Sequence, residues 1–313
     1  MAAAPRRHER GSADRWIGRV IASRYRLDEK LGAGTGGRVY RATALDQGRD
    51  VAVKIIEHAD RDGSSFRDRG VASMRLDHPG IPRVLDFGYD DDGVHYLVME
   101  RVEGQALDAV LRDKRRFDAV AAVEIALQLA RAIQHVHAAG LVHRDLKPSN
   151  VLLSRLADGA PKVSLLDFGI ASAPGAGGAG GMQGSPAYAA PGQSSGDAAD
   201  ARDDVYSLGV ILYELTTGRP PFADDSAIGV VLRHVHEAPK PPRMLEGSIP
   251  RRLEAAILRA LAKDRASRFQ AMSEWVEALE AIRDGLAKEE PPDHPVVSWM
   301  NDAWARFARL VGF

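Results

Sequence analysis

The sequence predicts an α+β fold with a small β-rich N-terminal lobe and a larger helical C-terminal lobe. Residues 25–99 contain short apolar or β-branched runs, such as Val51–Ile56 and Val94–Met99, which Gly/Asp turns separate. After residue 100 the apolar residues recur at helical spacing instead. A chain of 313 residues is also long enough for two lobes with a sizeable core.

The order of elements follows from these two patterns. One helix, at roughly Ser64–Leu76, interrupts the strand-like region. Further helical stripes lie near residues 203–217, 250–262 and 270–286. The first stripe of the helical region consists of Ala122, Ala126, Leu129, Ile133 and Val136. We therefore predict an N-lobe at 21–99, a hinge at 100–104 and a C-lobe at 105–286.

The two ends of the chain differ from this globular part. Residues 1–20 are polar and rich in Arg and Ala, and we expect a flexible leader. Residues 287–313 are predicted to form a linker and an amphipathic tail, in which five apolar residues share one helical face: Trp299, Ala303, Phe307, Leu310 and Val311. The tail is expected to dock on its own lobe or on a regulatory protein, and contact with a membrane surface is the less favoured alternative.

Composition excludes several classes of function. The formal net charge is −1, so no global field attracts the protein to nucleic acid. The absence of cysteine excludes disulfides, thiol catalysis and thiolate metal sites. We find no signal sequence and no run of about 18 apolar residues of the kind that spans a membrane. The cytoplasm is the expected location.

Two features of the N-lobe point to phosphate binding. The run Gly32–Val39 has glycines at positions 32, 34 and 37, which let a hairpin backbone approach phosphates closely. Such a run by itself is more often an ordinary turn. Lys54 follows on an apolar strand, where its ammonium group is suitably spaced to reach phosphate oxygens, although a lone lysine on a strand is commonly a solvated edge residue.

The strongest signal is in the C-lobe. The run His143–Asn150 reads His-Arg-Asp-Leu-Lys-Pro-Ser-Asn, and Asp167–Gly169 reads Asp-Phe-Gly. Phosphoryl transfer depends on positioned carboxylates, metal ligands and cations, and these two runs supply all three.

Together, the motifs over about residues 20–286 resemble the eukaryotic-type protein kinase family, and within it the bacterial Ser/Thr (Hanks-type) branch. The resemblance implies a kinase fold that uses ATP and Mg²⁺, with Mn²⁺ as an alternative ion. It implies that Asp145 accepts the proton of the substrate hydroxyl and that Lys147 approaches the γ-phosphate. Lys54 would pair with the α- and β-phosphates, while Asn150 and Asp167 would hold the metal. The implied ATP-binding residues are Leu31, Gly32, Ala33, Gly34, Gly37, Val39, Ala52, Lys54, Met99, Glu100, Val102 and Leu152.

The resemblance also implies the substrate class and the supporting structure. Lys147 is typical of the Ser/Thr branch, and Gly184–Tyr188 resembles the peptide-docking loop of protein kinases, which disfavours a small-molecule kinase. The expected partners are therefore protein substrates, with no nucleic acid. Met99 stands at the gatekeeper position, and Asp204 resembles the aspartate that steadies the catalytic-loop backbone.

Two charged pairs of the family are missing. The helix position that holds a glutamate for Lys54 carries Arg69, and like charges repel each other. The interpretations are an off-state that rearranges, a register shift that uses Asp68, or a loss of activity. Gly192 replaces the glutamate that pairs with an arginine corresponding to Arg268, which removes the usual partner of that arginine.

The activation segment is also atypical. Residues 173–184 are glycine-rich and contain no hydroxyl side chain, so activation by phosphorylation within them is not expected. Ser185 is predicted to serve substrate recognition, and Gly36 at the tip of the glycine run predicts a floppy phosphate lid. The alternative to an active kinase is a nucleotide-binding pseudokinase that acts as a scaffold.

Overall fold

The computed structural model describes residues 14–34, 37–56, 64–155, 161–167, 185–194 and 196–289. The chain divides into two compact units, an N-terminal unit (Met1–Arg67 with Val84–Arg101) and a C-terminal unit (Asp68–Arg83 with Val102–Phe313). The division after Arg101 falls inside the predicted hinge. Residues 68–83 were assigned to the N-lobe from the sequence, whereas in the structure they group with the C-terminal unit. Helix α1 (Ser64–Met74) crosses that division.

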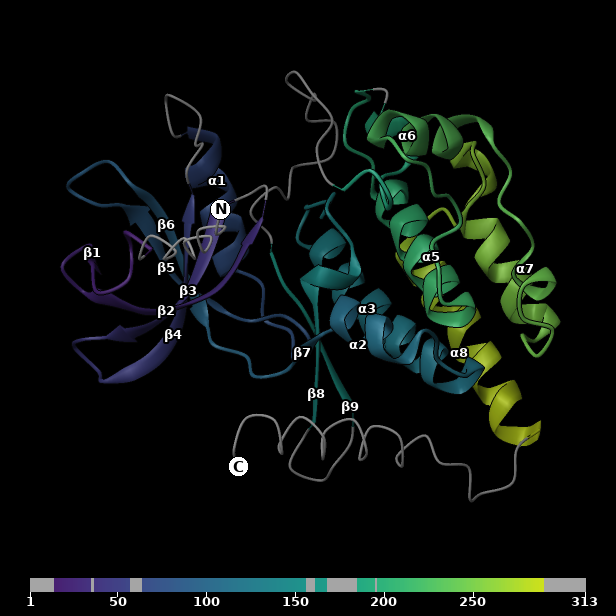
Figure 1. Ribbon diagram of the computed structural model, residues 1–313, viewed down its shortest axis with the longest axis horizontal. Coiled ribbons are helices and arrows are strands. Elements are labelled where there is room, and N and C mark those ends of the chain that lie inside the picture. Colours follow the sequence, from purple (N-terminus) through teal and green to yellow (C-terminus); the bar gives the residue numbers. More distant parts are fainter. Residues whose placement is uncertain are drawn as a thin grey trace, which may run out of the picture. The chain divides into compact units, whose positions relative to one another are not determined.

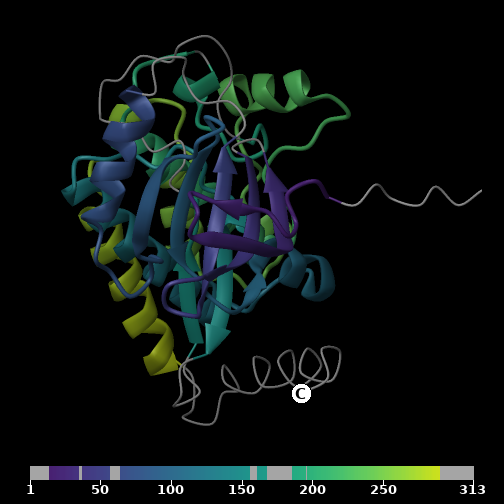
Figure 2. The same ribbon diagram turned by 90° about the vertical axis from the view of Figure 1, so that its left-hand side faces the viewer.

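The N-terminal unit is a six-stranded antiparallel sheet with the order β1-β2-β3-β4-β6-β5, whose purple to blue strands lie side by side in Figure 2. Alternation of buried and half-buried residues along β3 and the buried run of β4 make this sheet. Its core lies on one face and includes Tyr40, Val53 and Val98. The strands are β1 (Val20–Ile21), β2 (Tyr25–Gly34), β3 (Gly37–Ala44), β4 (Arg49–Ile56), β5 (Val84–Tyr89) and β6 (His95–Glu100).

Residues 14–20, which were predicted to belong to a flexible leader, are part of the described structure. Trp16 is only 4% exposed and packs in the sheet core, although the sequence analysis placed residues up to 20 in a flexible extension. The Asp14 carboxylate accepts a hydrogen bond from the Tyr40 hydroxyl at 3.0 Å. Burial of an indole ring outweighs the entropy of ordering a few residues, which explains the difference. Residues 1–13 lie outside the described part of the chain.

The C-terminal unit is built on helices (Figure 1). Its α-helices are α2 (Leu107–Lys114), α3 (Ala119–Ala138), α4 (Pro191–Ser194), α5 (Ala201–Thr217), α6 (Ala227–His236), α7 (Arg251–Ala260) and α8 (Met272–Glu289). Short 3-10 helices occur at η1 (Pro148–Asn150), η2 (Pro242–Met244) and η3 (Arg265–Ser267), and a small sheet joins β7 (Gln105–Ala106), β8 (Val151–Arg155) and β9 (Pro161–Leu165). Together with the sheet of the other unit, these helices confirm the predicted α+β class.

Helix α3 is the centre of the C-terminal core. The Asp118 carboxylate caps its first turn by accepting from the Ala121 amide at 2.8 Å, and the helix packs against α5 and α8. It is long and apolar enough to pass a membrane-span test by length and composition, which the sequence analysis did not anticipate, but its apolar window is 61% buried inside the protein. We therefore interpret α3 as a core helix.

Candidate active site

The glycine run forms the turn end of the β2–β3 hairpin. Gly32 pairs with Val39, and Gly34 pairs with Gly37. The register shifts between Lys30 and Gly32, so Leu31 lies in a bulge and is 50% exposed, while Ala33 pairs with Arg38. Gly36 lies outside the described residues.

The structure requires glycine at only one of the three positions, Gly37. A Cβ at Gly37 would lie 2.0 Å from the carbonyl oxygen of Ile55, and the residue has φ of +127°, so the fold itself requires glycine there. Among the described residues, a Cβ at Gly32 or Gly34 would meet no atom within 4 Å. Packing within the described part of the chain therefore does not require glycine at these two positions, and a bare backbone there leaves room for a ligand to approach.

The strand register gathers the predicted adenine and phosphate residues on one face of the sheet. Val39 pairs with Lys54, and Ala52 pairs with Met99, so each pair shares a face. That face is opposite the core, since the alternating residues of the same strands fill the core. Lys54 is only 2% exposed, which differs from the solvated edge lysine that a lone strand position often holds.

The predicted hinge residues surround the division between the units. Glu100 ends β6 and is exposed, while Val102 is half-buried. Leu152 lies on β8 in the C-terminal unit, where it pairs with Ala106 and is half-buried. The predicted site residues are thus divided between the two units.

In the C-terminal unit, Asp204 of α5 holds the catalytic loop. One carboxylate oxygen accepts from the His143 amide at 2.8 Å, and the other accepts from the Arg144 amide at 2.9 Å. Burial alone would raise the pKa of Asp204, but hydrogen bonds from His137 and the loop amides hold that pKa below its usual value. A charged carboxylate therefore fixes the loop backbone, as the resemblance implied.

Asp145 is held at one oxygen and unbonded at the other. Its Oδ2 accepts from the Lys147 ammonium at 2.6 Å and from the Asn150 amide at 3.1 Å. Its Oδ1 is buried and has no hydrogen-bond partner among the described residues. A buried carboxylate oxygen without a donor is costly, so Oδ1 is the oxygen that can accept a further hydrogen bond.

The predicted metal ligands are linked through the backbone. The side-chain amide of Asn150 donates to the Asp145 carbonyl at 2.8 Å and to its carboxylate, so the amide oxygen is the atom left to face a cation. The Leu166 amide donates to the Asn150 carbonyl at 2.8 Å, directly before Asp167, which has a left-handed φ of +64°. Phe168 and Gly169 lie outside the described residues.

This donor set fits magnesium. Within the described ranges no group of three or more His, Cys, Asp or Glu residues could hold a metal. Mg²⁺ is usually bound by one or two protein oxygens, with phosphates and water completing the coordination. Asn150 and Asp167 are oxygen donors of this kind.

The missing charged pair at Gly192 has a structural answer. Arg268 is fully buried and donates to the carbonyls of Ala262 at 2.8 Å and Arg202 at 2.9 Å. It also meets the carboxylate of Asp203 at 3.3 Å. The prediction that Arg268 loses its usual partner therefore does not leave it unpaired, because Asp203 supplies a carboxylate from α5.

Arg69 lies on α1 and is half-buried. Arg69 belongs to the C-terminal unit and Lys54 to the N-terminal unit. The absence of a charged partner for Lys54 on this helix therefore stays a prediction from the sequence. Residues 172–184 and 290–313, on which the predictions about the activation segment and the tail rest, lie outside the described part of the chain, whereas Ser185 is described and half-buried.

Comparison with known proteins decides the family. A model of the protein kinase domain matches residues 25–278. The chain belongs to the protein kinase family. It is 36% identical over 282 residues to the serine/threonine-protein kinase Pkn3 of Myxococcus xanthus, covering 86% of this chain and 52% of that protein. It is 38% identical over 290 residues to the serine/threonine-protein kinase PknB of Mycobacterium tuberculosis, covering 88% of this chain and 45% of that protein.

This kinase chain therefore spans about half the length of these two relatives. The kinase domain also contains contacts that the sequence analysis missed. Gln193, Asp203 and Arg265 form buried or half-buried polar contacts near the catalytic loop. The one available signal was the polar pair Asp203–Asp204 on an otherwise apolar helix, where two neighbouring acids point to two separate partners.

Proposed function

We propose that this chain is a protein serine/threonine kinase domain that transfers the γ-phosphoryl group of ATP to hydroxyl groups of proteins. The observation that carries the proposal is the carboxylate of Asp145: Oδ2 is held by Lys147 and Asn150, and Oδ1 is buried with no hydrogen-bond partner in the part of the chain that the structure describes. A substrate hydroxyl would donate its proton to Oδ1. General-base assistance of this kind contributes about 10² to 10⁴ in rate.

The charges around Asp145 support the same chemistry. Lys147 stays within 2.6 Å of the carboxylate, where its ammonium can balance developing negative charge on the transferred group. Asn150 and Asp167 would hold Mg²⁺, which neutralises phosphate charge. Lys54 and the bare glycines 32 and 34 would bind the ATP phosphates. We propose protein substrates, no nucleic-acid partner and a cytoplasmic, bacterial setting, with a regulatory contact through the tail.

A scaffold without activity is not favoured by the contacts at Gly192. The sequence suggested that its missing glutamate weakens the segment, but Arg265 and Asp197 lie against this position, and Asp203 pairs with both Arg265 and Arg268. Arg69, in place of the glutamate expected from the family pattern, is the second difference from that pattern. We propose that Arg69 keeps basal activity low until helix α1 rearranges.

Transfer of labelled phosphate from ATP with Mg²⁺ to a generic basic protein tests the proposal. We expect Asp145→Asn to lower kcat by about 10³-fold while ATP binding persists, because only the base is lost. Asp284→Asn, on an exposed turn of α8, is the matched control and should transfer like the wild type. Equal rates for Asp145→Asn and wild type would rule the assignment out.

The same assay tests Arg69. Arg69→Glu should raise kcat, because a carboxylate replaces a cation at the position that serves Lys54 in relatives. Unchanged transfer would show that Arg69 is not a brake. If wild type and both variants are silent although ATP binds, the scaffold becomes the better interpretation.

A further inference from the structure

The side chain of Gln193 joins two segments that are far apart in the sequence. Its Oε1 accepts from the Ala190 amide at 3.0 Å, and its Nε2 donates to the Arg144 carbonyl at 2.7 Å. Gln193 is 3% exposed, so both bonds are shielded from water. A glutamine amide has one acceptor oxygen and two donor hydrogens, and here each end serves a different backbone.

The carbonyl that Gln193 binds belongs to the peptide bond just before Asp145. Arg144 has a left-handed φ of +66°, a conformation that a non-glycine residue keeps only when its surroundings hold it. Its amide is held by Asp204 at 2.9 Å, and its carbonyl is held by Gln193. The Asp145 amide, on the other side of the same peptide bond, donates to His143 Nδ1 at 3.3 Å. Gln193 therefore fixes one edge of the peptide plane that carries Asp145.

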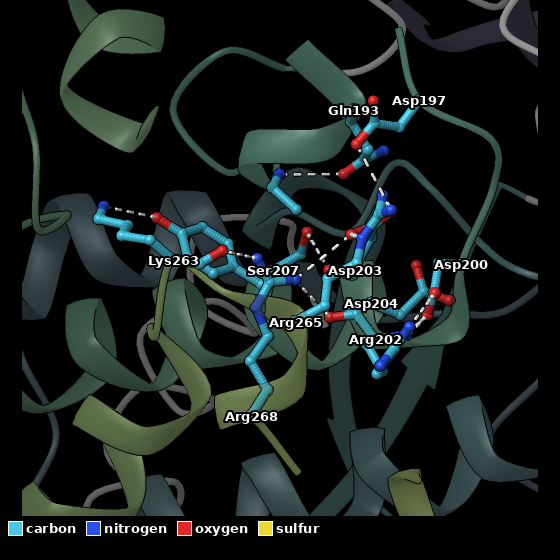
Figure 3. Close-up of polar contacts among 12 residues, drawn as sticks. Gln193, Asp197, Asp200, Arg202, Asp203, Asp204, Ser207, Lys263, Arg265 and Arg268 are labelled. Carbon is cyan, nitrogen blue, oxygen red and sulfur yellow. Dashed lines mark hydrogen bonds and ion pairs between the residues drawn. The ribbon is translucent and has the colours of Figure 1, made fainter. Parts of the chain in front are cut away.

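The space beside the neighbouring residue, Gly192, is occupied by Arg265. A Cβ at Gly192 would lie 2.2 Å from Arg265 Nη2 and 2.7 Å from its Cζ, so a guanidinium already fills that space. Arg265 is held there by Asp203 through two bonds, Nε to Oδ1 at 3.0 Å and Nη2 to Oδ2 at 2.8 Å, and Asp197 lies 3.4 Å away (Figure 3). A side chain at position 192 cannot enter without displacing Arg265.

The two adjacent acids of α5 therefore have separate tasks. Asp204 binds the catalytic loop directly, while Asp203 binds Arg265 and Arg268. In Figure 3, dashed lines join Arg265 to Asp203 and to Asp197, and Gln193 is drawn beside Asp197.

We propose that Gln193 is a positioning residue of the phosphotransfer reaction, which sets the orientation of Asp145 by holding the Arg144 carbonyl. This inference rests on the proposed kinase function. Gln193 does not contact the reacting groups. It acts through the backbone of the catalytic loop, next to Gly192, which has no side chain.

Two variants separate its two bonds. Gln193→Glu keeps an acceptor for the Ala190 amide but loses the donor to the Arg144 carbonyl. Gln193→Met keeps the volume and loses both bonds. The matched control is Gln128 of α3, which bridges the Pro161 carbonyl at 3.2 Å and the Val163 amide at 3.0 Å in the same manner, away from the catalytic loop.

The experiment measures kcat, KM for ATP and the melting temperature of the full chain, together with hydrogen exchange of fragments that cover residues 141–148. Both Gln193 variants should lower kcat by about 10- to 100-fold, with KM for ATP changed by less than about 3-fold, because misplacement of the base affects turnover and not nucleotide binding. Their melting temperatures should fall no further than those of Gln128→Met and Gln128→Glu, which should keep kcat.

Hydrogen exchange decides the inference independently of activity. The Arg144 and Asp145 amides should exchange at least about 10-fold faster in both Gln193 variants than in the wild type and in the Gln128 variants. Unchanged exchange, or a loss of kcat that the Gln128 variants share, overturns the role of Gln193. A silent wild type with faster exchange in the variants would mean that the proposed function fails while Gln193 still fixes the loop.

Discussion

The catalytic loop and the glycine hairpin are held in opposite ways. Around Asp145 the loop backbone is bonded by buried side chains from α5 and from the segment before it, namely Asp204 and Gln193. In the hairpin, by contrast, Gly32 and Gly34 have open space where a side chain would be, and Leu31 is half exposed. Charges that must act on a reacting atom need a rigid backbone, whereas a cover over phosphates needs room.

The catalytic loop should therefore be the more sensitive region. Asp204→Ala would leave the His143 and Arg144 amides buried without partners and should lower the free energy of unfolding by about 3 to 5 kcal/mol. It should also reduce kcat by about 10²-fold, because the loop loses its shape. Urea unfolding and phosphate transfer measure these two effects.

Asp200→Ala is the control on the same helix. Asp200 is the half-buried N-cap of α5 and should cost only about 1 kcal/mol, with kcat retained. Equal losses from the two variants would show that the loop has no special dependence on Asp204.

The hairpin should divide into one structural glycine and two functional ones. Gly37→Ala should lower the free energy of unfolding by about 2 to 4 kcal/mol, because its Cβ meets the Ile55 carbonyl at 2.0 Å and its φ is positive. Gly34→Ala should change stability by less than about 1 kcal/mol and instead raise KM for ATP. A stability loss at Gly34 as large as that at Gly37 would contradict the comparison.

A further expected effect is a pH dependence in the buried network of the C-terminal unit. His234 Nε2 lies 3.1 Å from the Ala187 carbonyl and Nδ1 lies 2.9 Å from the Tyr206 hydroxyl, an arrangement that suits the neutral ring. Burial, together with the charge of Lys263, lowers the pKa of His234 to about 4.

The direction of the pH effect on stability follows from the difference in proton binding between the folded and unfolded states. The unfolded chain, with an ordinary histidine pKa, binds more protons between about pH 6.5 and about pH 4, so the native state loses stability as the pH falls through that window. We expect a loss of about 2 kcal/mol at about pH 5 relative to pH 7 from this group. Urea unfolding of His234→Gln should show a smaller loss, and His236→Gln, at an exposed position of the same helix, should behave like the wild type.

Some features could be predicted from the sequence. The strand run at residues 51–56 became part of β4, and the stripes near 203–217 and 270–286 became α5 and α8, because hydrophobic periodicity reports which side of an element is buried. Three of the residues that the resemblance implies, Asp145, Lys147 and Asn150, lie in one short run, so local order alone brings them together.

Other features could not be predicted from the sequence. The sequence placed Trp16 in a flexible leader because nothing local shows which surface an indole will meet, yet it packs in the sheet core. It treated Gly192 as a loss, since the compensating Asp203 and Arg265 lie on other elements. Such pairs depend on contacts across long separations, which periodicity does not encode.

The sequence by itself determined the order of elements, the family and the identities of the groups that carry phosphoryl transfer, because these are written in local patterns and compact motifs. Only the tertiary structure decided which oxygen of Asp145 has no donor among the described residues, and that the Arg265 guanidinium occupies the space beside Gly192. It also placed Gln193 on the peptide before the catalytic aspartate. Each of these depends on the meeting of backbone and side chains that lie tens of residues apart, and burial then fixes which hydrogen bonds remain.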